Sequence, residues 1–445
     1  MLRKRYKYIA FRLMGAALLM ALLGTSCMTS STYLERRREW DLAAAALDAG
    51  VGQLFMLSLR VDVEGAQRKD PVIEVDDVVV RLIREIQPGG IILYGENLVD
   101  AAQTVRLIRE LQALSATPLF IALDEEGGRV SRLARTPALG SPRLPANLGI
   151  GALADPALSQ EKGAIIGEQL RVLGFNVAFS VIADIFTNPR NTVIGDRSYG
   201  ADPQLVSELV AGEVRGILAS GVLPVLKHFP GHGDTVEDSH YRTARSNRSA
   251  AQLEEAELLP FVAGFEAGAA GIMVGHIAMP AMDPSGLPAT FSQILTTGLL
   301  RDSLGFQGLV FTDALEMGGA GFRGITGDER ALQAFLAGSD VLLVPPRPLD
   351  SYRKVLDACK TDAAARQRLD ESLRRIHEAK TSMGLLMGSP DFPVLPEWQK
   401  FMDNRDIPAR IAMITAAVEN PNAKDSATDN GSDPTQNTTA TGQGE

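Results

Sequence analysis

The sequence is poor in cysteine, and this scarcity limits what can hold the chain together. Its 445 residues include two cysteines, Cys27 near the start and Cys359 deep in the chain, so no disulfide framework is expected. Concentrated positive charge is also lacking, since the net charge is −10 and the pI is near 5.2. No stripe of Lys and Arg offsets this balance, which argues against a nucleic-acid partner. No G-x-G-x-x-G motif follows an early strand, which removes the usual dinucleotide-binding fingerprint.

A long apolar run is missing as well, which weakens the case for a permanent membrane-spanning helix. A basic start leads into an apolar run from Leu13 to Leu23 that is too short to span a bilayer comfortably. The run ends in Gly24-Thr-Ser-Cys27, which resembles a bacterial lipoprotein box, although a large aliphatic residue usually stands where Gly24 does. We therefore expect residues 1–27 to be a signal segment with an acylated Cys27, and residues 28–50 to be a spacer. Simple secretion and an uncleaved anchor are the alternatives.

This reading of the start of the chain predicts where the protein works. An acylated cysteine would attach it to a membrane of the bacterial cell envelope, facing either the periplasm or the surface. The lipid anchor would then be its contact with the membrane.

What the chain does have is a regular alternation of short apolar runs and helix-like segments. Each apolar run has the pattern of a strand that is buried on both faces. Eight such runs alternating with helices predict a TIM-type (β/α)8 barrel over residues 51–388. An open doubly wound sheet is the alternative. The strand candidates are residues 54–59, 90–93, 119–123, 176–179, 223–226, 271–274, 309–312 and 341–344. The helix candidates are residues 75–86, 100–114, 159–173, 203–219, 250–267, 292–304 and 328–337, followed by one or two closing helices over residues 353–383.

The alternating pattern degrades after Gly388. Residues 389–419 combine a proline-rich linker with a short amphipathic helix around Ile407 to Val418. Residues 420–445 are rich in Asn, Asp, Thr, Ser and Gly. Such a tail is too polar to pack, so we expect it to be disordered.

The stretch from Leu223 to Arg242 holds three of the five histidines. Its glycines and prolines indicate a loop that leaves the carboxyl end of a strand. In this loop Asp238 and His240 are close enough for the carboxylate to bind one imidazole nitrogen, leaving the other free for acid/base work. A surface Asx turn with an unemployed histidine explains the pair equally well. A metal site is a further alternative, and it would be built from His228, His232, Asp238 and His240.

Polar and charged side chains follow the predicted strands at their carboxyl ends, where barrel enzymes keep their chemistry. Isolated helix caps do not explain carboxylates, cations and histidines after five successive strands. Such a mixture of acceptors and cationic donors suits a polyhydroxylated substrate. Glycoside cleavage needs a carboxylate facing the anomeric carbon, and the residues alone nominate Asp124 or Asp313 without choosing between them. The positions are Asp124, Arg132, Asp184, Arg197, Lys227, His228, His276, Asp313 and Glu316.

Four longer strings give the chain a specific resemblance to a known family. They are LDEEGGRVSRL, NPRNTVIGDRSYG, KHFPGHGDTVEDSH and FTDALEM, in this order. Together they resemble the β-N-acetylglucosaminidases of glycoside hydrolase family 3, and the likeness covers roughly Val51 to Leu385. KHFPGHG followed by DSH is the most specific of these motifs. No second αβα domain follows the barrel, so the chain resembles the single-domain bacterial members.

The resemblance implies a role for the matching residues. Asp313 would be the nucleophile, and His240 would be the acid/base catalyst supported by Asp238. The residues expected to bind the sugar are Asp124, Arg132, Arg197, Lys227 and His228. The likeness thus favours Asp313 over Asp124 as nucleophile, argues against the metal site, and implies no cofactor. Glu125 stands where the family usually has Gln, and this extra charge is expected to alter the outer part of the pocket.

The leading hypothesis is a retaining glycoside hydrolase that releases terminal N-acetylglucosamine from peptidoglycan fragments or related glycans. A phosphorylase is a close rival, because a histidine acid/base does not repel an anionic acceptor. A β-glucosidase or β-xylosidase of the same family is another. From a different class comes a surface lipoprotein that only binds glycans, which would be expected to lack the nucleophile or the acid. This sequence keeps both candidates.

Overall fold

The computed structural model describes residues 47–322, 324–386 and 398–421. The signal segment with Cys27, nearly all of the spacer and most of the tail lie outside the described residues, and these three expectations stay predictions. Within the described part of the chain, no helix has both the length and the apolarity needed to cross a bilayer.

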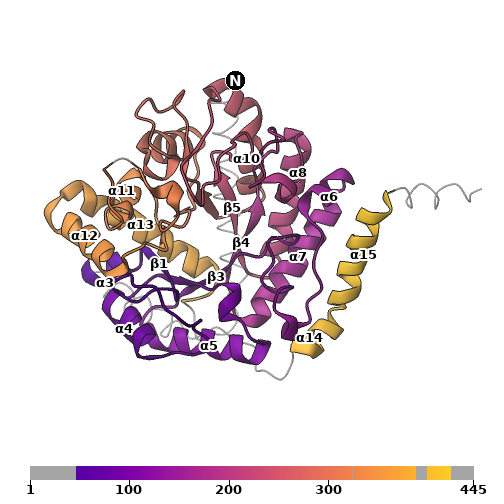
Figure 1. The fold of residues 1–445 in the computed structure, drawn as a ribbon, viewed down its shortest axis with the longest axis horizontal. Helices are drawn as coiled ribbons and strands as arrows, with labels where there is room; N and C mark the ends of the chain where they lie inside the picture. The colour runs from indigo at the N-terminus through magenta and orange to yellow at the C-terminus, as the bar shows by residue number, and fades with distance from the viewer. Residues whose placement is uncertain (1–46, 323, 387–397, 422–445) are drawn as a thin grey trace, which may run out of the picture.

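Eight parallel strands form a nearly closed barrel at the centre of the molecule (Figure 1). They are β1 (Phe55–Ser58), β2 (Gly90–Ile92), β3 (Phe120–Leu123), β4 (Val177–Ile182), β5 (Leu223–Phe229), β7 (Gly271–Val274), β9 (Leu309–Thr312) and β10 (Leu342–Leu343). Their order in the sheet is β10-β1-β2-β3-β4-β5-β7-β9. A parallel bridge between Phe311 of β9 and Val341, which directly precedes β10, joins the two ends of this order. The predicted TIM-type barrel is therefore confirmed, with a strand at each apolar run, and β4 and β5 extend beyond theirs.

The barrel strands are buried along their whole length, which is why their sequences are continuous apolar runs. Phe179 of β4 and Phe311 of β9 meet edge to face, with 5.5 Å between their ring centroids. Aromatic pairs prefer this geometry because the positive ring edge meets the negative face. The rings help to fill the space that the strands enclose.

Helices surround the barrel and shield the outer faces of its strands (Figure 1). The α-helices are α3 (Leu47–Gly52), α4 (Asp77–Ile86), α5 (Ala101–Leu114), α6 (Asn147–Ala152), α7 (Pro156–Leu173), α8 (Pro203–Leu218), α9 (Ala250–Gln252), α10 (Leu259–Glu266), α11 (Arg330–Ala337), α12 (Pro348–Thr361), α13 (Ala363–Ser382), α14 (Trp398–Asn404) and α15 (Ile407–Glu419). The π-helices are η4 (Leu253–Glu257) and η6 (Ile294–Ser303). The short 3-10 turns are η1 (Gly95–Asn97), η2 (Pro137–Leu139), η3 (Gly195–Arg197), η5 (Ala289–Phe291) and η7 (Gly318–Ala320).

Aspartate begins many of the outer helices. Asp76, Asp100, Asp155, Asp202 and Asp362 are the N-caps of α4, α5, α7, α8 and α13, and each side chain accepts a hydrogen bond from a backbone N–H in the first turn. Each cap is worth about 1 kcal/mol because it satisfies a donor that has no partner within the helix. These caps fix where the helices start.

Two segments predicted as single α-helices contain other helix types or are divided. The single helix expected over residues 250–267 is divided into α9, η4 and α10. Pro260 lies at the start of α10, where its missing backbone N–H is tolerated, whereas inside a longer α-helix it would break the hydrogen-bond pattern. The helix expected over residues 292–304 is the π-helix η6.

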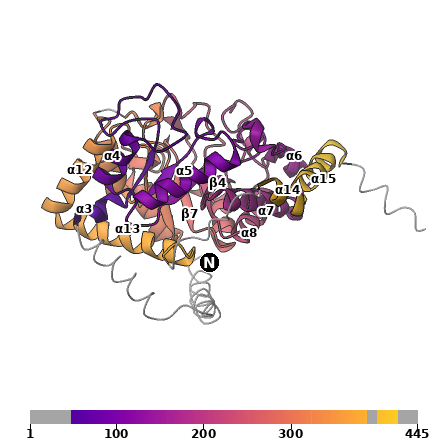
Figure 2. The same cartoon turned by 90° about the horizontal axis from the view of Figure 1, so that it is seen from below.

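Residues 398–421 pack against the outside of the barrel domain. Helices α14 and α15 lie along α7, at the edge of the molecule in both views (Figures 1 and 2). The indole nitrogen of Trp398 donates to the carbonyl of Leu139 at 2.5 Å. Arg410 binds Glu161 at 2.5 Å and Glu168 at 2.8 Å, which joins α15 to α7. The helix expected around residues 407–418 is present as α15, and α14 is an addition to the prediction.

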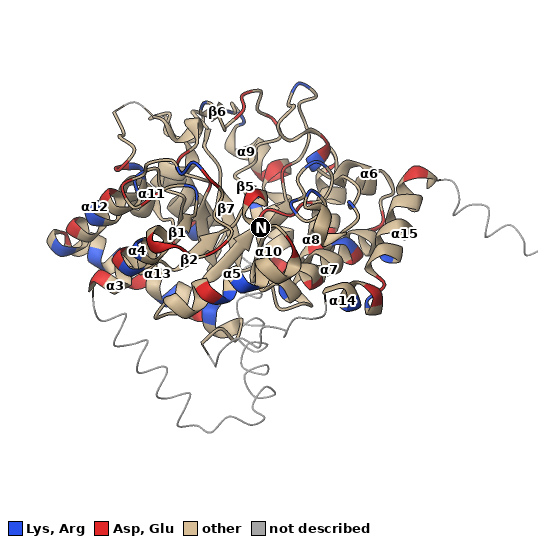
Figure 3. Cartoon of the chain, turned by 60° about the horizontal axis from the view of Figure 1, so that its bottom comes forward, with Lys and Arg blue, Asp and Glu red and all other residues tan. Residues whose placement is uncertain are grey.

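Charged residues of both signs are mixed along the outer helices. In Figure 3, Lys and Arg alternate with Asp and Glu along α12, α4 and α5. Several of them form pairs one helical turn apart, such as Arg81 with Glu85 and Arg374 with Glu378. This mixed surface is consistent with the absence of a basic stripe in the sequence.

Strand β5 is longer than predicted and changes the setting of two site residues. It runs to Phe229, so Lys227 and His228 belong to the end of the strand, whereas the sequence placed them on the loop after it. Lys227 pairs with Ile182 of β4, and Phe229 pairs with Val274 of β7. Pairing on both sides extends the strand beyond its apolar run. The peptide bonds before His228 and Pro230 are cis.

A small second sheet holds the far end of the loop that follows β5. Strand β6 (Ala244–Arg245) pairs in parallel with β8 (Ile277–Ala278), which directly follows β7. The backbone N–H of Ala244 donates to the carbonyl of His276 at 3.0 Å. Both ends of the loop that carries Asp238 and His240 are thus fixed to the barrel.

Candidate active site

A pocket of about 260 Å³ opens at the carboxyl ends of the barrel strands. Barrel side chains such as Phe179 and Met273 contribute apolar surface, and polar groups provide the rest of the lining. The predicted residues that line it are Asp124, Arg132, Arg197, Lys227, His228, His240 and Asp313. Asp238 does not line the pocket but binds His240. The fold therefore gathers side chains from distant parts of the sequence around one space.

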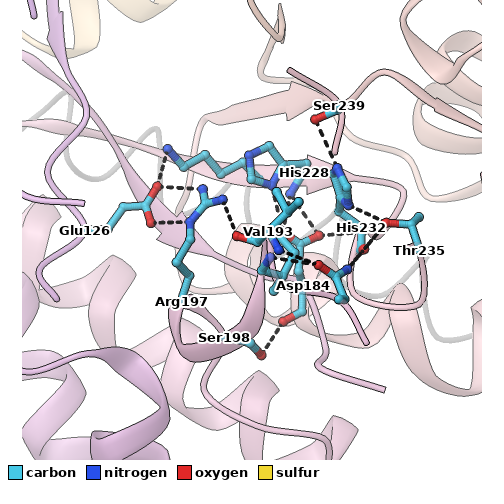
Figure 4. Close-up of polar contacts among 12 residues, drawn as sticks. Glu126, Asp184, Val193, Arg197, Ser198, His228, His232, Thr235 and Ser239 are labelled. Carbon is cyan, nitrogen blue, oxygen red and sulfur yellow. Dashed lines mark hydrogen bonds and ion pairs between the residues drawn. The ribbon is translucent and has the colours of Figure 1, made fainter. Parts of the chain in front are cut away.

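A cluster of two carboxylates and two cations forms one part of the pocket lining. Lys227 Nζ lies 2.8 Å from Asp124 Oδ1 and 2.8 Å from Glu126 Oε1, and it donates to the carbonyl of Phe179 at 2.7 Å. Arg197 grips the same Glu126 with two parallel hydrogen bonds of 2.8 and 2.9 Å (Figure 4). Paired bonds of this kind fix the plane of the guanidinium group. The cluster therefore presents Lys227, Arg197 and Asp124 in defined positions.

The opposite charges in this cluster keep one another ionised although the side chains are buried. Burial alone would raise the pKa of Glu126, but the charges of Arg197 and Lys227 outweigh it and hold that pKa far below its ordinary value. Burial likewise opposes the charged form of Lys227, yet Asp124 and Glu126 raise its pKa above the ordinary value. Glu126 and Lys227 are therefore both charged at neutral pH.

Glu125 is not among the residues that line the pocket. Its Oε2 accepts hydrogen bonds from the backbone N–H groups of Arg132, at 2.7 Å, and Leu133, at 3.0 Å. The side chain is buried, and burial raises its pKa. Its carboxyl group supports the loop that carries Arg132, so any effect of Glu125 on the outer pocket passes through that loop, and the expected effect stays a prediction. Arg132 itself reaches the pocket, 3.9 Å from Asp124 Oδ2.

Asp184 holds a second group of residues from β4 and β5. Its Oδ2 lies 2.7 Å from His228 Nδ1, and its Oδ1 accepts the backbone N–H of His232 at 2.7 Å (Figure 4). Burial would raise the pKa of Asp184, but the neighbouring His228 lowers it below its ordinary value. The sequence placed Asp184 at a strand end without a role. The structure shows it fixing the ring of His228, whose Nε2 stays available to a ligand.

His232 connects Asp184 to the loop that carries Asp238 and His240. Its Nδ1 lies 2.7 Å from the hydroxyl of Thr235, and its Nε2 lies 3.1 Å from the hydroxyl of Ser239 (Figure 4). Burial lowers the pKa of His232 to about 4, so the ring is neutral at pH 7. Ser239 directly precedes His240, so the contact with His232 supports the loop that carries His240.

Asp313 follows β9 and is half-buried in the pocket. Its backbone N–H donates to the carbonyl of Val274 at 2.9 Å, and its Oδ1 accepts from the backbone N–H of Ala314 at 2.8 Å. Burial would raise the pKa of Asp313, but the nearby His276 and His228 lower it below its ordinary value. The carboxylate is therefore ionised at neutral pH, as a nucleophile requires.

Asp238 and His240 form the contact that the sequence predicted. Asp238 Oδ1 lies 2.7 Å from His240 Nδ1, and it also accepts the backbone N–H of His240 at 2.9 Å. The histidine side chain is 60% exposed and the aspartate side chain 38% exposed, so the ring can exchange protons at the mouth of the pocket. Burial works against the charge of Asp238, but its bonds to His240 lower its pKa. Nδ1 is occupied, and Nε2 remains for acid/base work.

The loop carrying His240 rests directly on the loop that follows Asp313. The backbone N–H of Gly318 donates to the carbonyl of His240, and that of Gly319 donates to the carbonyl of Ser239, both at 2.9 Å. A Cβ atom on Gly318 would lie 2.3 Å from the carbonyl oxygen of Tyr241, so only glycine permits this approach. Two backbone hydrogen bonds thus hold the loop that carries His240 against the loop that follows Asp313.

The residues of the metal-site alternative do not converge. His228 binds Asp184, His240 binds Asp238, and His232 binds two hydroxyl groups. Among the residues that the structure describes, no group of three or more His, Cys, Asp or Glu side chains is arranged to hold a metal ion.

A family comparison identifies what kind of protein carries this pocket. The family model described as the glycosyl hydrolase family 3 N-terminal domain matches residues 46–379. The chain belongs to glycosyl hydrolase family 3. The matched region contains the whole barrel and every residue of the pocket.

Named relatives of this family 3 chain are hexosaminidases. It is 36% identical over 332 residues to the beta-hexosaminidase A of Pseudoalteromonas piscicida, covering 68% of this chain and 54% of that protein. It therefore spans only about half the length of that relative. The chain is also 36% identical over 294 residues to the beta-hexosaminidase of Nitrosospira multiformis, covering 65% of this chain and 80% of the relative.

A solved structure gives the same family and fold. A glycoside hydrolase family 3 beta-N-acetylglucosaminidase from Paenibacillus sp. str. FPU-7 matches with a TM-score of 0.71 at 36% identity. The match covers 82% of this chain and 68% of that one. The resemblance drawn from the sequence motifs is confirmed at the level of family and fold.

Some residues of this family 3 pocket were missed by the motif argument. Arg60, which follows β1, lies with its guanidinium carbon 3.5 Å from the centroid of the Tyr94 ring. It also pairs with Glu96 at 2.5 Å and lies 3.9 Å from Glu316. Arg60 and Tyr94 line the pocket together with Glu316. Arg60 comes directly after the predicted strand 54–59, so the rule that found the other strand-end residues would have found it.

We predict that replacing Glu126 with Gln destabilises the family 3 barrel by about 3 kcal/mol, because Lys227 and Arg197 then lose a buried counter-charge. The folded pKa of Glu126 is lowered, so its contribution is present above the ordinary value of 4.5 and disappears as the pH falls toward the folded pKa. The difference between wild type and variant should therefore shrink in acid. Urea denaturation at pH 7 and at pH 3 measures both effects.

The matched control for Glu126→Gln is Glu96→Gln. Glu96 also pairs with an arginine, but both side chains are more than one third exposed. An exposed pair contributes at most about 1 kcal/mol. Equal losses in the two variants would contradict the importance of the buried cluster.

Proposed function

We propose that this protein is a retaining glycoside hydrolase that releases terminal β-linked N-acetylglucosamine from peptidoglycan fragments or related glycans. The observation that carries the proposal is the meeting of Asp313 and His240 in one pocket with the cluster around Glu126. An ionised carboxylate and a solvent-accessible imidazole are the nucleophile and acid/base catalyst that a two-step mechanism needs. The similar Paenibacillus protein is a beta-N-acetylglucosaminidase, which supports N-acetylglucosamine as the sugar, and the two relatives named beta-hexosaminidase support a hexosaminide substrate.

The first chemical step forms a covalent glycosyl enzyme. A carboxylate oxygen of Asp313 attacks the anomeric carbon, and the electrons of the breaking bond remain on the departing oxygen. Nε2 of His240 gives its proton to that oxygen. The Asp238 carboxylate holds the ring through Nδ1 and faces the positive charge that His240 carries before the transfer.

The second step releases the sugar. Nε2 of His240 removes a proton from a water molecule, and the water oxygen attacks the anomeric carbon. The bond to Asp313 breaks, which regenerates the carboxylate. Two inversions give net retention, so the β anomer is the first product.

The cluster around Glu126 suits the recognition of sugar hydroxyl groups. Asp124 supplies an acceptor, whereas Lys227, Arg197 and Arg132 supply donors, and the Nε2 atom of His228 is left for a further hydrogen bond. Both oxygens of Glu126 are bound to Arg197 and Lys227, and its side chain is only 2% exposed. We assign Glu126 the task of fixing the two cations, and the other side chains the task of binding the sugar.

Product analysis tests the proposed function. The enzyme is incubated with nitrophenyl β-N-acetylglucosaminide, β-glucoside and β-xyloside, with and without phosphate. We expect N-acetylglucosamine to be released fastest, as the β anomer by NMR, and to be free of phosphate. A sugar 1-phosphate would identify a phosphorylase, and faster cleavage of the glucoside or xyloside would identify a different specificity. Binding without turnover would support the glycan-binding alternative.

We also propose that the protein is anchored in the bacterial cell envelope through Cys27. The basic start, the short apolar run and the position of this cysteine support lipid attachment. We predict that Cys27→Ser moves the protein from the detergent phase to the aqueous phase in a phase-partition assay. Cys359→Ser is the control, because Cys359 is buried in the barrel domain and should not affect partitioning. A mature wild-type protein whose mass shows no lipid would contradict the anchor.

A further inference from the structure

A polar network is buried behind the pocket, between the outer helices α6, α7 and α8. Lys162 of α7 and Glu213 of α8 are fully buried and lie 2.6 Å apart, Nζ to Oε1. The hydroxyl of Tyr199, a residue 1% exposed, donates to Glu213 Oε2 at 2.7 Å. Lys162 Nζ also donates to Oδ1 of Asn147 at 2.7 Å. These four side chains bind one another, and none of them lines the pocket.

One bond leads from this network toward the sugar-binding residues. Asn147 Nδ2 donates to the backbone carbonyl of Arg197 at 2.7 Å. Because Lys162 can only donate, it holds the Oδ1 side of the amide and leaves the NH₂ group facing Arg197. The amide of Asn147 therefore has one favoured orientation, and that orientation is set outside the pocket.

The segment around Arg197 is held from the pocket side as well. The Arg197 side chain makes its two bonds to Glu126, and the hydroxyl of Ser198 donates to the backbone carbonyl of Asp184 at 2.6 Å (Figure 4). Asp184 in turn holds His228. This segment thus joins the buried network to two of the predicted sugar-binding residues: it contains Arg197, and it contacts Asp184, which holds His228.

The helices that carry the network form a rigid frame. A Cβ atom on Gly163 of α7 would lie 2.3 Å from the carbonyl oxygen of Glu213, and one on Gly216 of α8 would lie 2.1 Å from that of Gln160. The two backbones are therefore in contact without intervening side chains. Lys162 and Glu213 have little freedom to shift, so the amide of Asn147 is held in a fixed place.

Stability alone does not account for this arrangement. Replacing a buried ion pair by apolar side chains of similar volume is often neutral or stabilising, because the desolvation of two charges is costly. Purely apolar packing between α7 and α8 would hold the helices together, but it would supply no donor for the Arg197 carbonyl. The directed bond from Asn147 is what the polar network adds.

We propose that Asn147 is a positioning residue for Arg197, and that Lys162, Glu213 and Tyr199 keep its amide in the donating orientation. The inference rests on the proposed function, in which Arg197 binds the sugar. Asn147 acts through the backbone of Arg197 and does not touch the substrate. Its loss should weaken the binding of sugar in the ground state and in the transition state alike, which raises KM more than it lowers kcat.

The test replaces Asn147 with Asp, which has the same shape and still accepts the bond from Lys162 but cannot donate to Arg197. We expect KM for nitrophenyl β-N-acetylglucosaminide and Kd for free N-acetylglucosamine to rise roughly tenfold, with kcat within about threefold of wild type. Steady-state kinetics and calorimetric titration with N-acetylglucosamine measure these constants on the full chain.

Asn176→Asp is the matched control. Asn176 is also a buried asparagine, and its Nδ2 donates to the backbone carbonyl of Leu119 at 3.0 Å at the amino ends of the barrel strands. It undergoes the same chemical change far from the pocket, so it should lower Tm without changing KM or Kd. If Asn147→Asp lowers Tm but leaves both constants at their wild-type values, as the control does, the positioning role is excluded.

Tyr199→Phe provides a second variant in case Asn147→Asp does not fold. It removes only the hydroxyl that binds Glu213, so a smaller rise in KM and Kd of about two- to threefold is expected. Tyr352→Phe is its control, because that hydroxyl donates to the carbonyl of Asp48 on the outside of the barrel. Unchanged constants in a folded Tyr199→Phe would contradict the role of the network. A wild-type enzyme that releases no N-acetylglucosamine would instead overturn the proposed function itself.

Discussion

Replacing His240 with Ala should convert the enzyme into one that stops after its first step. With nitrophenyl β-N-acetylglucosaminide we expect a rapid burst of nitrophenolate equal to the enzyme concentration, followed by very slow release. Nitrophenolate departs without a proton, so formation of the glycosyl enzyme survives the loss of the acid. Its breakdown still needs a base to activate water, and the intermediate accumulates.

Natural substrates should show the opposite pattern. A sugar leaving group needs the proton from His240, so turnover of a β-linked N-acetylglucosamine disaccharide should fall by roughly 10²- to 10⁴-fold with no burst. Rapid-mixing kinetics and the intact mass of the protein measure the burst and the trapped sugar. Azide, which attacks without a general base, should restore the turnover of the nitrophenyl substrate.

His377→Ala is the control for this experiment. His377 lies on α13, outside the pocket, and its replacement should leave the kinetics unchanged. The assignment of His240 fails if His240→Ala slows the nitrophenyl substrate and the disaccharide by equal factors without accumulating an adduct.

Replacing Asp313 with Ala should abolish both the burst and the adduct. Removing the nucleophile of a covalent mechanism costs roughly 10⁶-fold in turnover, because neither of the two steps can take place. The variant should still bind N-acetylglucosamine, since the cluster around Glu126 remains intact. Steady-state assays, mass spectrometry and calorimetric titration separate these effects.

Asp124→Asn is the informative comparison, because Asp124 was the competing nucleophile on the evidence of residue types alone. Asp124 is engaged with Lys227 and lies near Arg132, which suits a hydroxyl acceptor. Its replacement should weaken sugar binding and still permit an adduct. Peptide mapping of the trapped sugar decides the matter: a sugar attached to Asp124 in the wild-type enzyme would reverse the two roles.

Much of the fold could be predicted because it depends on short stretches of sequence. Strands of a parallel barrel are buried on both faces, so each one is an apolar run that can be recognised by itself. Aspartates at the helix starts have a local cause too, since each caps a backbone group two or three residues away. The contact between Asp238 and His240 was predictable for the same reason, because it joins residues two positions apart.

The pocket could be predicted in part, because the fold itself brings strand ends together. Once a parallel barrel is recognised, the residues after its strands must lie at one end, and this placed Asp124, Lys227 and Asp313 around one space. The same reasoning was not applied to Arg60 after the first strand. The family motifs predicted what each residue does, whereas the position after a strand predicted only that the residue lies near the pocket.

By itself, then, the sequence determined the barrel, the family and the pair of Asp238 and His240, since these follow from local patterns. The tertiary structure alone decided which distant partners share a charge or a hydrogen bond. It placed Lys227 and Arg197 on Glu126, turned Glu125 onto the backbone, and joined Asn147 to the carbonyl of Arg197. Each of these choices depends on the distances and directions of side chains that are separated in the sequence but meet in the folded chain. No periodicity encodes such contacts, because they arise only when strands and helices have packed.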